Sequence, residues 1–136
     1  ILLIMTELSE PFNKICQILL KDLAEVSKEN NSIKFFRKDF TTMSMWLLII
    51  SAKLNGNKIN IEDIARAIAT INKVSKPSLR TFLERAKHRG YLKFIKNVDD
   101  HRSLNVEPEE IMIKEFKFWI KKFLKENEKI NFQEFQ

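Results

Sequence analysis

The sequence predicts a mainly α-helical protein with one small β-hairpin. Two observations carry this prediction. Apolar residues recur at steps of three and four along most of the 136-residue chain, which is typical of amphipathic helices. From Tyr91 the pattern changes to alternation between two faces, over two short stretches separated by a polar tip, which is typical of a hairpin. The length suits one compact domain, so residues 1–136 are expected to form a single domain.

A first helix is expected over about residues 9–30. Ser9 is a good helix cap, and Pro11 fits the first turn, where its missing N–H costs nothing. Its apolar face consists of Ile15, Ile18, Leu19, Leu23 and Val26. The single cysteine, Cys16, sits among these apolar residues, and we expect it to be a buried structural thiol and not a redox sensor.

A second helix is expected after Asp39, which can cap it, and Asn55-Gly56-Asn57 ends it because Gly and Asn tolerate the left-handed conformation. Its apolar stripe is formed by Phe40, Met43, Leu47, Ile50 and Leu54, and Trp46 and Ile49 widen it.

The next segment predicts two short helices joined by a tight turn. Lys58–Ile61 is a short extended piece, and the acidic pair Glu62-Asp63 suits the first turn of a helix that closes near Ile71. Ser75 caps the next helix, which ends at Gly90 and spans about residues 75–89. A hairpin over about residues 91–106 follows, and Pro108 opens a last helix that runs to about residue 127. This order is the topology of a winged helix-turn-helix, with its core at about residues 40–108 and a helix on either side.

The positive charge of the chain is concentrated in one segment. Lys73–Arg102 contains nine Lys or Arg and three Asp or Glu, a net charge of +6, whereas the rest of the chain has fifteen of each. Concentrated positive charge of this kind indicates a polyanionic partner. No apolar run approaches the roughly 18 residues of a membrane span. The run Ile1–Met5 lacks the features of a signal peptide, and a single cysteine fits a reducing compartment, so we expect a cytoplasmic protein without a membrane partner.

Double-stranded DNA is the partner that this topology and charge predict. A helix fits the major groove and presents its N-terminal residues to the base edges, while a basic wing reaches phosphates or the minor groove. Arg80 is the best candidate for reading guanine with two hydrogen bonds. The candidate DNA-binding residues are Ser75, Lys76, Ser78, Arg80, Thr81, Arg85, Lys96, Asp100 and Arg102.

Four short motifs in this region resemble the MarR family (multiple antibiotic resistance regulators). They are Val74-Ser75-Lys76-Pro77-Ser78-Leu79-Arg80, Leu83-Glu84, Arg89-Gly90-Tyr91-Leu92 and Asp99-Asp100-His101-Arg102-Ser103. The resemblance covers about residues 41–110. It departs from the family pattern at His101, where the family has arginine, and after the wing.

The resemblance implies a homodimeric transcription regulator. It implies that Asp100 orients Arg102, which enters the minor groove, and that the terminal helices pair two copies of the chain. A dimer presents two recognition helices, and narrow A·T-rich minor grooves attract arginine, so an A·T-rich palindrome is the expected target. The expected interface residues are Ile15, Leu19, Met112, Phe116, Trp119 and Phe123. The resemblance also allows for a small aromatic effector.

Catalytic and cofactor signals are missing from the sequence, so we expect neither an enzyme nor a cofactor. The two histidines, His88 and His101, both fall in the basic segment, no His/Cys cluster has the spacing of a metal site, and two glycines cannot form a phosphate-binding loop. Two alternatives remain at this point: a winged-helix module that binds proteins, and a DNA-binding protein of replication or partition.

Overall fold

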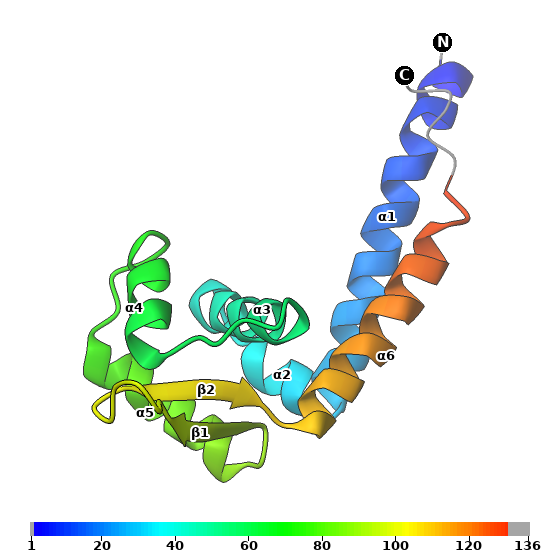
Figure 1. Ribbon diagram of the computed structural model, residues 1–136. Helices are drawn as coiled ribbons and strands as arrows, with labels where there is room; N and C mark the ends of the chain where they lie inside the picture. Colours follow the sequence, from blue (N-terminus) through cyan, green and yellow to red (C-terminus); the bar gives the residue numbers. More distant parts are fainter. Residues whose placement is uncertain (1, 131–136) are drawn as a thin grey trace. The chain divides into compact units, whose positions relative to one another are not determined.

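The computed structural model describes the backbone of residues 2–130 and the side chains of residues 10–130 (Figure 1). The chain divides into two compact units. One is formed by Asn31–Glu115, and the other combines the residues up to Asn30 with those from Phe116 onward. The two units are described separately below. That the whole chain acts as a single domain stays a prediction.

The unit formed by residues 31–115 contains the predicted winged helix-turn-helix. Its elements are α2 (Ser32–Phe36), α3 (Phe40–Leu54), α4 (Ile61–Ala69), α5 (Lys76–His88), β1 (Leu92–Lys96), β2 (Leu104–Pro108) and the first turns of α6 (Glu110–Asn127). This mainly helical fold with one antiparallel hairpin confirms the predicted fold class. The sequence analysis missed α2, whose five residues are too few to show a helical period.

Side-chain caps begin α3 and α5 where the sequence predicted them, at Asp39 and Ser75, and a third cap at Asn60, which the sequence analysis did not name, begins α4. Asp39 accepts a hydrogen bond from the backbone N–H of Thr42 at 2.8 Å and begins α3. Asn60 and Asp63 form a reciprocal capping box at α4, with distances of 2.7 and 3.0 Å. Ser75 caps α5 through the backbone N–H of Ser78. These contacts are local in sequence, which is why they could be predicted.

Two glycines end α3 and α5 as expected. Gly56 follows α3 with φ of +71°, and Gly90 follows α5 with φ of +83°. Residues with a Cβ rarely adopt these left-handed values, so glycine stops both helices cleanly.

The hairpin is longer on its return arm than the sequence predicted. Leu92 pairs with Pro108 and Lys96 pairs with Leu104, so β2 continues beyond Val106 and α6 begins at Glu110 instead of Pro108. Pairing with β1 keeps Pro108 in the sheet, where a proline is tolerated at a strand end. On the other side of β2, the carbonyl of Ile59 accepts a hydrogen bond from the backbone N–H of Val106 at 2.8 Å. The predicted extended piece before α4 therefore packs along the hairpin.

The core of this unit lies among α2, α3, α4, α5 and the hairpin. Its buried apolar residues are Ile33, Phe36, Met45, Trp46, Ile49, Ile50, Ile61, Ile64, Ile68, Leu79, Phe82, Leu83, Ala86, Leu92, Val106 and Met112. Aromatic rings join α2 to α5, because Phe35 stacks on Phe82 with 5.0 Å between ring centroids and Phe36 meets the same ring edge-on at 5.5 Å.

The predicted apolar face of α3 was wrong in part: Trp46, Ile49 and Ile50 are buried as expected, but Phe40, Leu47 and Leu54 are not. Met45, Trp46 and Ile49 point into the core, whereas Phe40 is 85% exposed and Leu47 and Leu54 are also exposed. The helix is apolar on most sides, so periodicity alone could not tell which side would be covered.

The second unit pairs α1 (Leu2–Lys28) with the part of α6 from Phe116 onward. The predicted start near Ser9 was wrong, because α1 begins at Leu2 and contains Pro11. A proline within a helix removes one hydrogen bond and bends the helix, but it need not end it. The indole N–H of Trp119 donates to Asp22 at 2.6 Å, and Lys122 donates to Glu25 at 2.8 Å.

The outer side of α1 carries exposed apolar residues. Leu19, Leu20 and Leu23 are 41%, 59% and 54% exposed. Cys16 is exposed as well, so the expectation of a buried thiol was wrong: the thiol lies on the side of α1 that carries the exposed leucines. None of the described helices combines the length and apolar character needed to cross a bilayer.

Candidate nucleic-acid interface

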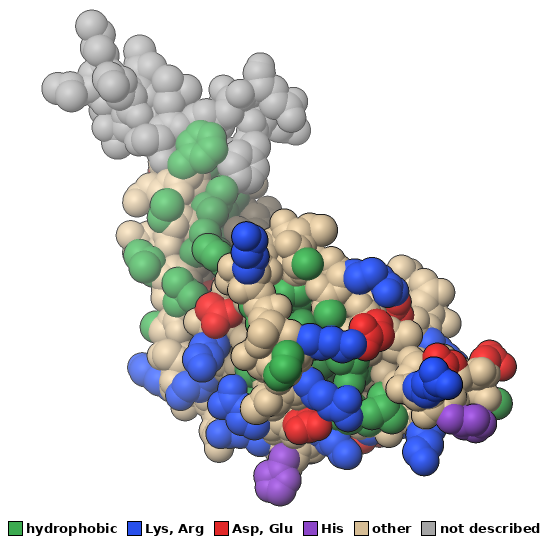
Figure 2. All heavy atoms as spheres, turned by 90° about the vertical axis from the view of Figure 1, so that its left-hand side faces the viewer, with side chains coloured by type: hydrophobic (Ala, Val, Ile, Leu, Met, Phe, Trp, Pro, Cys, Tyr) green, Lys and Arg blue, Asp and Glu red, His purple; other side chains and the backbone are tan. Residues whose placement is uncertain are grey.

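All nine candidate DNA-binding residues lie in the unit of residues 31–115, and all nine are exposed. Six of them are on α5 or its cap, Lys96 ends β1, and Asp100 and Arg102 lie in the loop between β1 and β2. Figure 2 shows Lys and Arg side chains spread over this part of the molecule among fewer Asp and Glu side chains. The predicted basic surface is therefore present as a surface of one folded unit.

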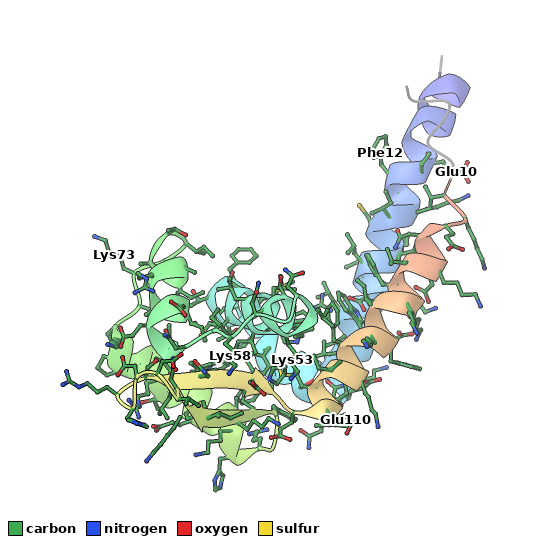
Figure 3. The ribbon with its side chains drawn as sticks, in the orientation of Figure 1. Glu10, Phe12, Lys53, Lys58, Lys73 and Glu110 are labelled. Atoms are coloured by element: carbon green, nitrogen blue, oxygen red, sulfur yellow. The ribbon has the colours of Figure 1, made fainter. Side chains whose placement is uncertain are left out.

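Burial of one face of α5 turns its polar face outward. Leu79, Phe82, Leu83 and Ala86 recur at helical spacing and are buried in the core. The residues between them, including Arg80, consequently point to solvent. In the same unit, Figure 3 shows Lys73 in the turn that precedes this helix.

A hollow of about 420 Å³ brings four candidates together. Lys76 and Arg80 of α5 line it with Asp100 and Arg102 of the wing loop. Arg66 of α4 also lines this hollow, and the sequence analysis had not selected it. Arg66 lies on the side of α4 opposite its buried residues, and this position could have predicted that its side chain is exposed. Cations from three elements therefore converge on one depression.

A second hollow of about 650 Å³ lies between α5 and β1. Arg80, Lys87 and His88 of α5 line it with Lys96 of β1. Arg80 and Leu104 line both hollows, so the two adjoin along the exposed face of α5, and we call them together the α5 groove. Lys87 and His88 were not among the selected candidates, although they follow Arg80 at helical spacing.

Several candidates lie outside the α5 groove. Ser78, Thr81 and Arg85 line neither hollow, and the guanidinium of Arg85 lies over the ring of Phe82 at 5.5 Å. The hydroxyl of Ser75 donates to the hydroxyl of Ser78 at 2.8 Å, so both side chains take part in the helix cap.

Two glutamates engage cations of α5. Lys76 forms an ion pair with Glu62 of α4. The Nε of Arg80 lies 3.2 Å from Oε1 of Glu84, one turn further along the same helix. The α5 groove therefore contains acids in defined positions as well as cations.

The wing aspartate contacts the backbone of the wing arginine. Asp100 accepts a hydrogen bond from the backbone N–H of Arg102 at 3.0 Å, which shapes the turn. In the part of the chain that the structure describes, neither Arg102 nor Lys96 forms an ion pair, so both cations are available to an anion.

The expected dimer residues fall into two groups. Ile15 and Leu19 of α1 and the aromatic residues Phe116, Trp119 and Phe123 of α6 belong to the second unit, where Trp119 stacks on Phe123 with centroids 5.8 Å apart. Met112 belongs to the other unit and is completely buried in the single chain. It is a core residue, so its place in an interface has to be corrected.

Among the described residues, no group of three or more His, Cys, Asp or Glu side chains is arranged to hold a metal ion.

Comparisons with known proteins give a consistent result at the level of fold. No family model and no curated protein sequence matches the chain. Among solved structures, MepR of S. aureus in complex with DNA aligns with a TM-score of 0.63 at 14% identity, over 87% of this chain and 85% of that one. AbfR in its disulfide form aligns with a TM-score of 0.51 at 14% identity, over 90% and 72% of the two chains.

NadR in complex with 4-hydroxyphenylacetate aligns with a TM-score of 0.50 at 14% identity, over 92% of this chain and 70% of that one. These neighbours are MarR-family transcription regulators. The chain therefore has the winged helix-turn-helix fold of the MarR-family regulators.

Proposed function

We propose that the chain is a sequence-specific regulator of transcription that binds double-stranded DNA as a homodimer. The observation that carries the proposal is the α5 groove, in which cations from α4, α5 and the wing line two adjoining hollows. A convergent basic surface on a helix that fits the major groove is suited to a polyanion with a regular shape. The MepR–DNA complex supports this function at the level of fold.

In this proposal α5 enters the major groove and the wing contacts the flanking DNA. Lys76 and Arg80 lie on the exposed first half of α5, the half that reaches base edges in helix-turn-helix proteins. Arg102 and Lys96 on the hairpin reach the minor groove and the phosphates. Because a narrow A·T-rich minor groove attracts arginine, Arg102 favours an A·T-rich flank.

A second copy of the chain is the proposed occupant of the outer side of α1. Leu19, Leu20 and Leu23 form an exposed apolar surface there, and Phe118 and Leu124 of α6 are 73% and 57% exposed in the same unit. Exposed apolar surface of this kind marks interaction sites. A dimer would also present two copies of α5 to a palindrome.

A small aromatic effector is part of the proposal. Within the second unit, a hollow of about 490 Å³ lies between α1 and the end of α6, with Ile18 and Ile130 beside Lys14, Lys21 and Lys129. Glu126 also lines this hollow and pairs with Lys21, and Lys14 pairs with Glu10. The size suits a small ligand, and the apolar residues together with Lys129 suit an aromatic carboxylate. The test is a thermal unfolding series with 4-hydroxyphenylacetate, the ligand in the NadR complex, and with the corresponding uncharged phenol. A transition temperature that neither compound raises would argue against an effector of this class.

The decisive experiment is selection of bound sequences from a random pool of duplex DNA. A dimer is expected to recover palindromes with half-sites about one helical turn apart, flanked by A·T pairs. Binding to the selected site should weaken steeply as salt rises, because phosphate contacts release counterions. Absence of duplex binding even at low salt would instead favour a winged-helix module that binds proteins.

Arg102→Ala tests the wing directly. We expect the affinity for the selected site to fall by about tenfold, consistent with the loss of one specific contact. Lys114→Ala is the matched control, because Lys114 is an exposed cation of the same unit that lines neither hollow of the α5 groove. Equal affinities of the two variants would remove the wing from the interface.

A further inference from the structure

We infer that Glu84 is a positioning residue that fixes how Arg80 reads a base, an inference that rests on the proposed DNA-binding function. Two residues line both hollows of the α5 groove: Arg80 of α5 and Leu104 of β2. Glu84 lines the second hollow and lies one helical turn after Arg80. The pair therefore stands in the middle of the surface proposed to meet DNA.

The contact engages one particular donor of the guanidinium. Nε of Arg80 donates to Oε1 of Glu84 at 3.2 Å. Among the described residues, Arg80 has no other hydrogen-bond or ion-pair partner. A guanidinium has five N–H donors, so the four donors on its two terminal nitrogens remain available.

The free donors form a fork that matches guanine. Guanine presents O6 and N7 as neighbouring acceptors in the major groove, and a bidentate arginine contacts both. With Nε occupied by Glu84, Arg80 can make this contact only with its two terminal nitrogens, end-on. Glu84 therefore selects one of the two ways in which a guanidinium can present a pair of donors, and it holds the side chain in that geometry.

The position and order of the pair speak against a role in helix stability alone. On a helix, an acid placed four residues before a cation stabilises more than the reverse order. At a spacing of four residues, the pairs Glu10–Lys14 and Glu110–Lys114 have the favourable order and lie outside the α5 groove. Asp63 and Arg66 also have the acid first, at a spacing of three, and Arg66 lines the groove. In Arg80–Glu84 the order is reversed, and the pair lies inside the groove.

Glu84 also changes the electrostatics of the interface. A carboxylate beside DNA repels phosphates, so it weakens binding to every sequence equally. Its contribution to selectivity has the opposite sign, because an oriented fork discriminates among bases. These two effects can be separated by two substitutions.

Glu84→Gln keeps an oxygen that can accept from Nε and removes the charge, whereas Glu84→Ala removes both. The probes are the selected site, the same site with each guanine of the recognition half-site replaced in turn by adenine, and an unrelated duplex. The wild-type chain is expected to lose about tenfold in affinity at the guanine that Arg80 reads. Glu84→Gln should retain that loss and bind the unrelated duplex about twofold to fivefold more tightly.

Glu84→Ala should also bind the unrelated duplex more tightly, but its discrimination at that guanine should shrink to about threefold or less. Glu110→Ala is the matched control, since it removes the same charge from an exposed helical pair at the start of α6 (Figure 3). Glu110→Ala should change neither the affinity for the unrelated duplex nor the discrimination at that guanine. Circular dichroism confirms that each variant is folded, which the exposure of Glu84 favours.

The outcomes separate this inference from the function on which it rests. If the wild-type chain binds no duplex, the proposed function falls. If it binds duplex without selecting guanine, or if Glu84→Ala keeps the wild-type discrimination, DNA binding stands and the positioning role of Glu84 is overturned. A matching effect of Glu110→Ala would likewise overturn it, because the effect would then be one of net charge.

Discussion

The backbone N–H and the hydroxyl of Ser32 both donate to the same oxygen of Glu115, at 3.1 and 2.7 Å. Ser32 is the first residue of α2 and is completely buried, and Glu115 lies on α6. One carboxylate thus satisfies two donors that burial has removed from water. It ties the base of α6 to α2, whose aromatic residues pack on Phe82 of α5 within the same unit.

We expect Glu115→Ala to destabilise the protein by about 1–3 kcal/mol, because two buried donors lose their acceptor. Glu115→Gln should cost less, since its amide oxygen can still accept. Urea unfolding followed by circular dichroism measures both. Glu110→Ala, which removes an exposed carboxylate one turn earlier, should stay within about 0.5 kcal/mol of the parent. A Glu115→Ala variant as stable as Glu110→Ala would show that the Ser32 contact contributes little.

The inward face of α3 predicts opposite results for two neighbouring residues. Ile49→Ala should cost about 2–5 kcal/mol, because Ile49 is completely buried and its truncation leaves a cavity. Leu47→Ala should cost less than about 1 kcal/mol, because Leu47 is 45% exposed. The same unfolding measurement applies. A larger loss of stability in Leu47→Ala than in Ile49→Ala would contradict the burial of Ile49 and the exposure of Leu47.

The ion pair between Glu25 of α1 and Lys122 of α6 should stabilise the folded protein only between a lower and an upper pH limit. The hydrogen bond from Lys122 is the main cause that lowers the pKa of Glu25, and the same bond raises the pKa of Lys122. The contribution of Glu25 to the free energy of unfolding is therefore present above its unfolded pKa, and it is lost as pH falls through its folded pKa. That of Lys122 is present below its unfolded pKa and is lost as pH rises through its folded pKa.

An NMR titration of the Glu25 carboxyl tests this pair. In Lys122→Met, the pKa of Glu25 should return upward toward the ordinary glutamate value. The shift should also diminish in high salt, because the pair is exposed to solvent. If the pKa of Glu25 stays the same in Lys122→Met, a group other than Lys122 lowers it.

The exposed thiol of Cys16 provides a probe of the proposed dimer. In dilute folded protein it should react with a soluble disulfide reagent without prior unfolding. Because it lies on the same side of α1 as Leu19, Leu20 and Leu23, dimerisation there should slow the reaction as protein concentration rises. Leu19→Glu should abolish that concentration dependence. A thiol that reacts only in denaturant would place Cys16 in a core instead.

The sequence by itself determined the elements whose signals are local. Asp39 and Ser75 make their capping contacts within three residues, and Gly56 and Gly90 end helices through their own backbone freedom. The alternation after Gly90 fixed the hairpin. Chain order then fixed the winged topology, and simple counting placed the net charge between residues 73 and 102.

Only the tertiary structure decided which surfaces those elements cover. The helix α3 is apolar on most sides and has one charged residue, Lys53, so its sequence does not say which face is buried. Packing against the neighbouring elements buries the face that carries Ile49 and leaves Leu47 exposed. In the same way, packing buried Met112 and left Cys16 exposed.

The α5 groove also combines features that the sequence predicted with features that only packing determined. Arg80 could be selected from its place on a helix, but Arg66 joins it only because α4 packs beside α5 and the wing. The role of Glu84 also became visible only once its oxygen was found on Nε of Arg80. Caps and turns depend on neighbours in the chain, whereas faces and convergent sites depend on residues far apart in sequence that packing brings together.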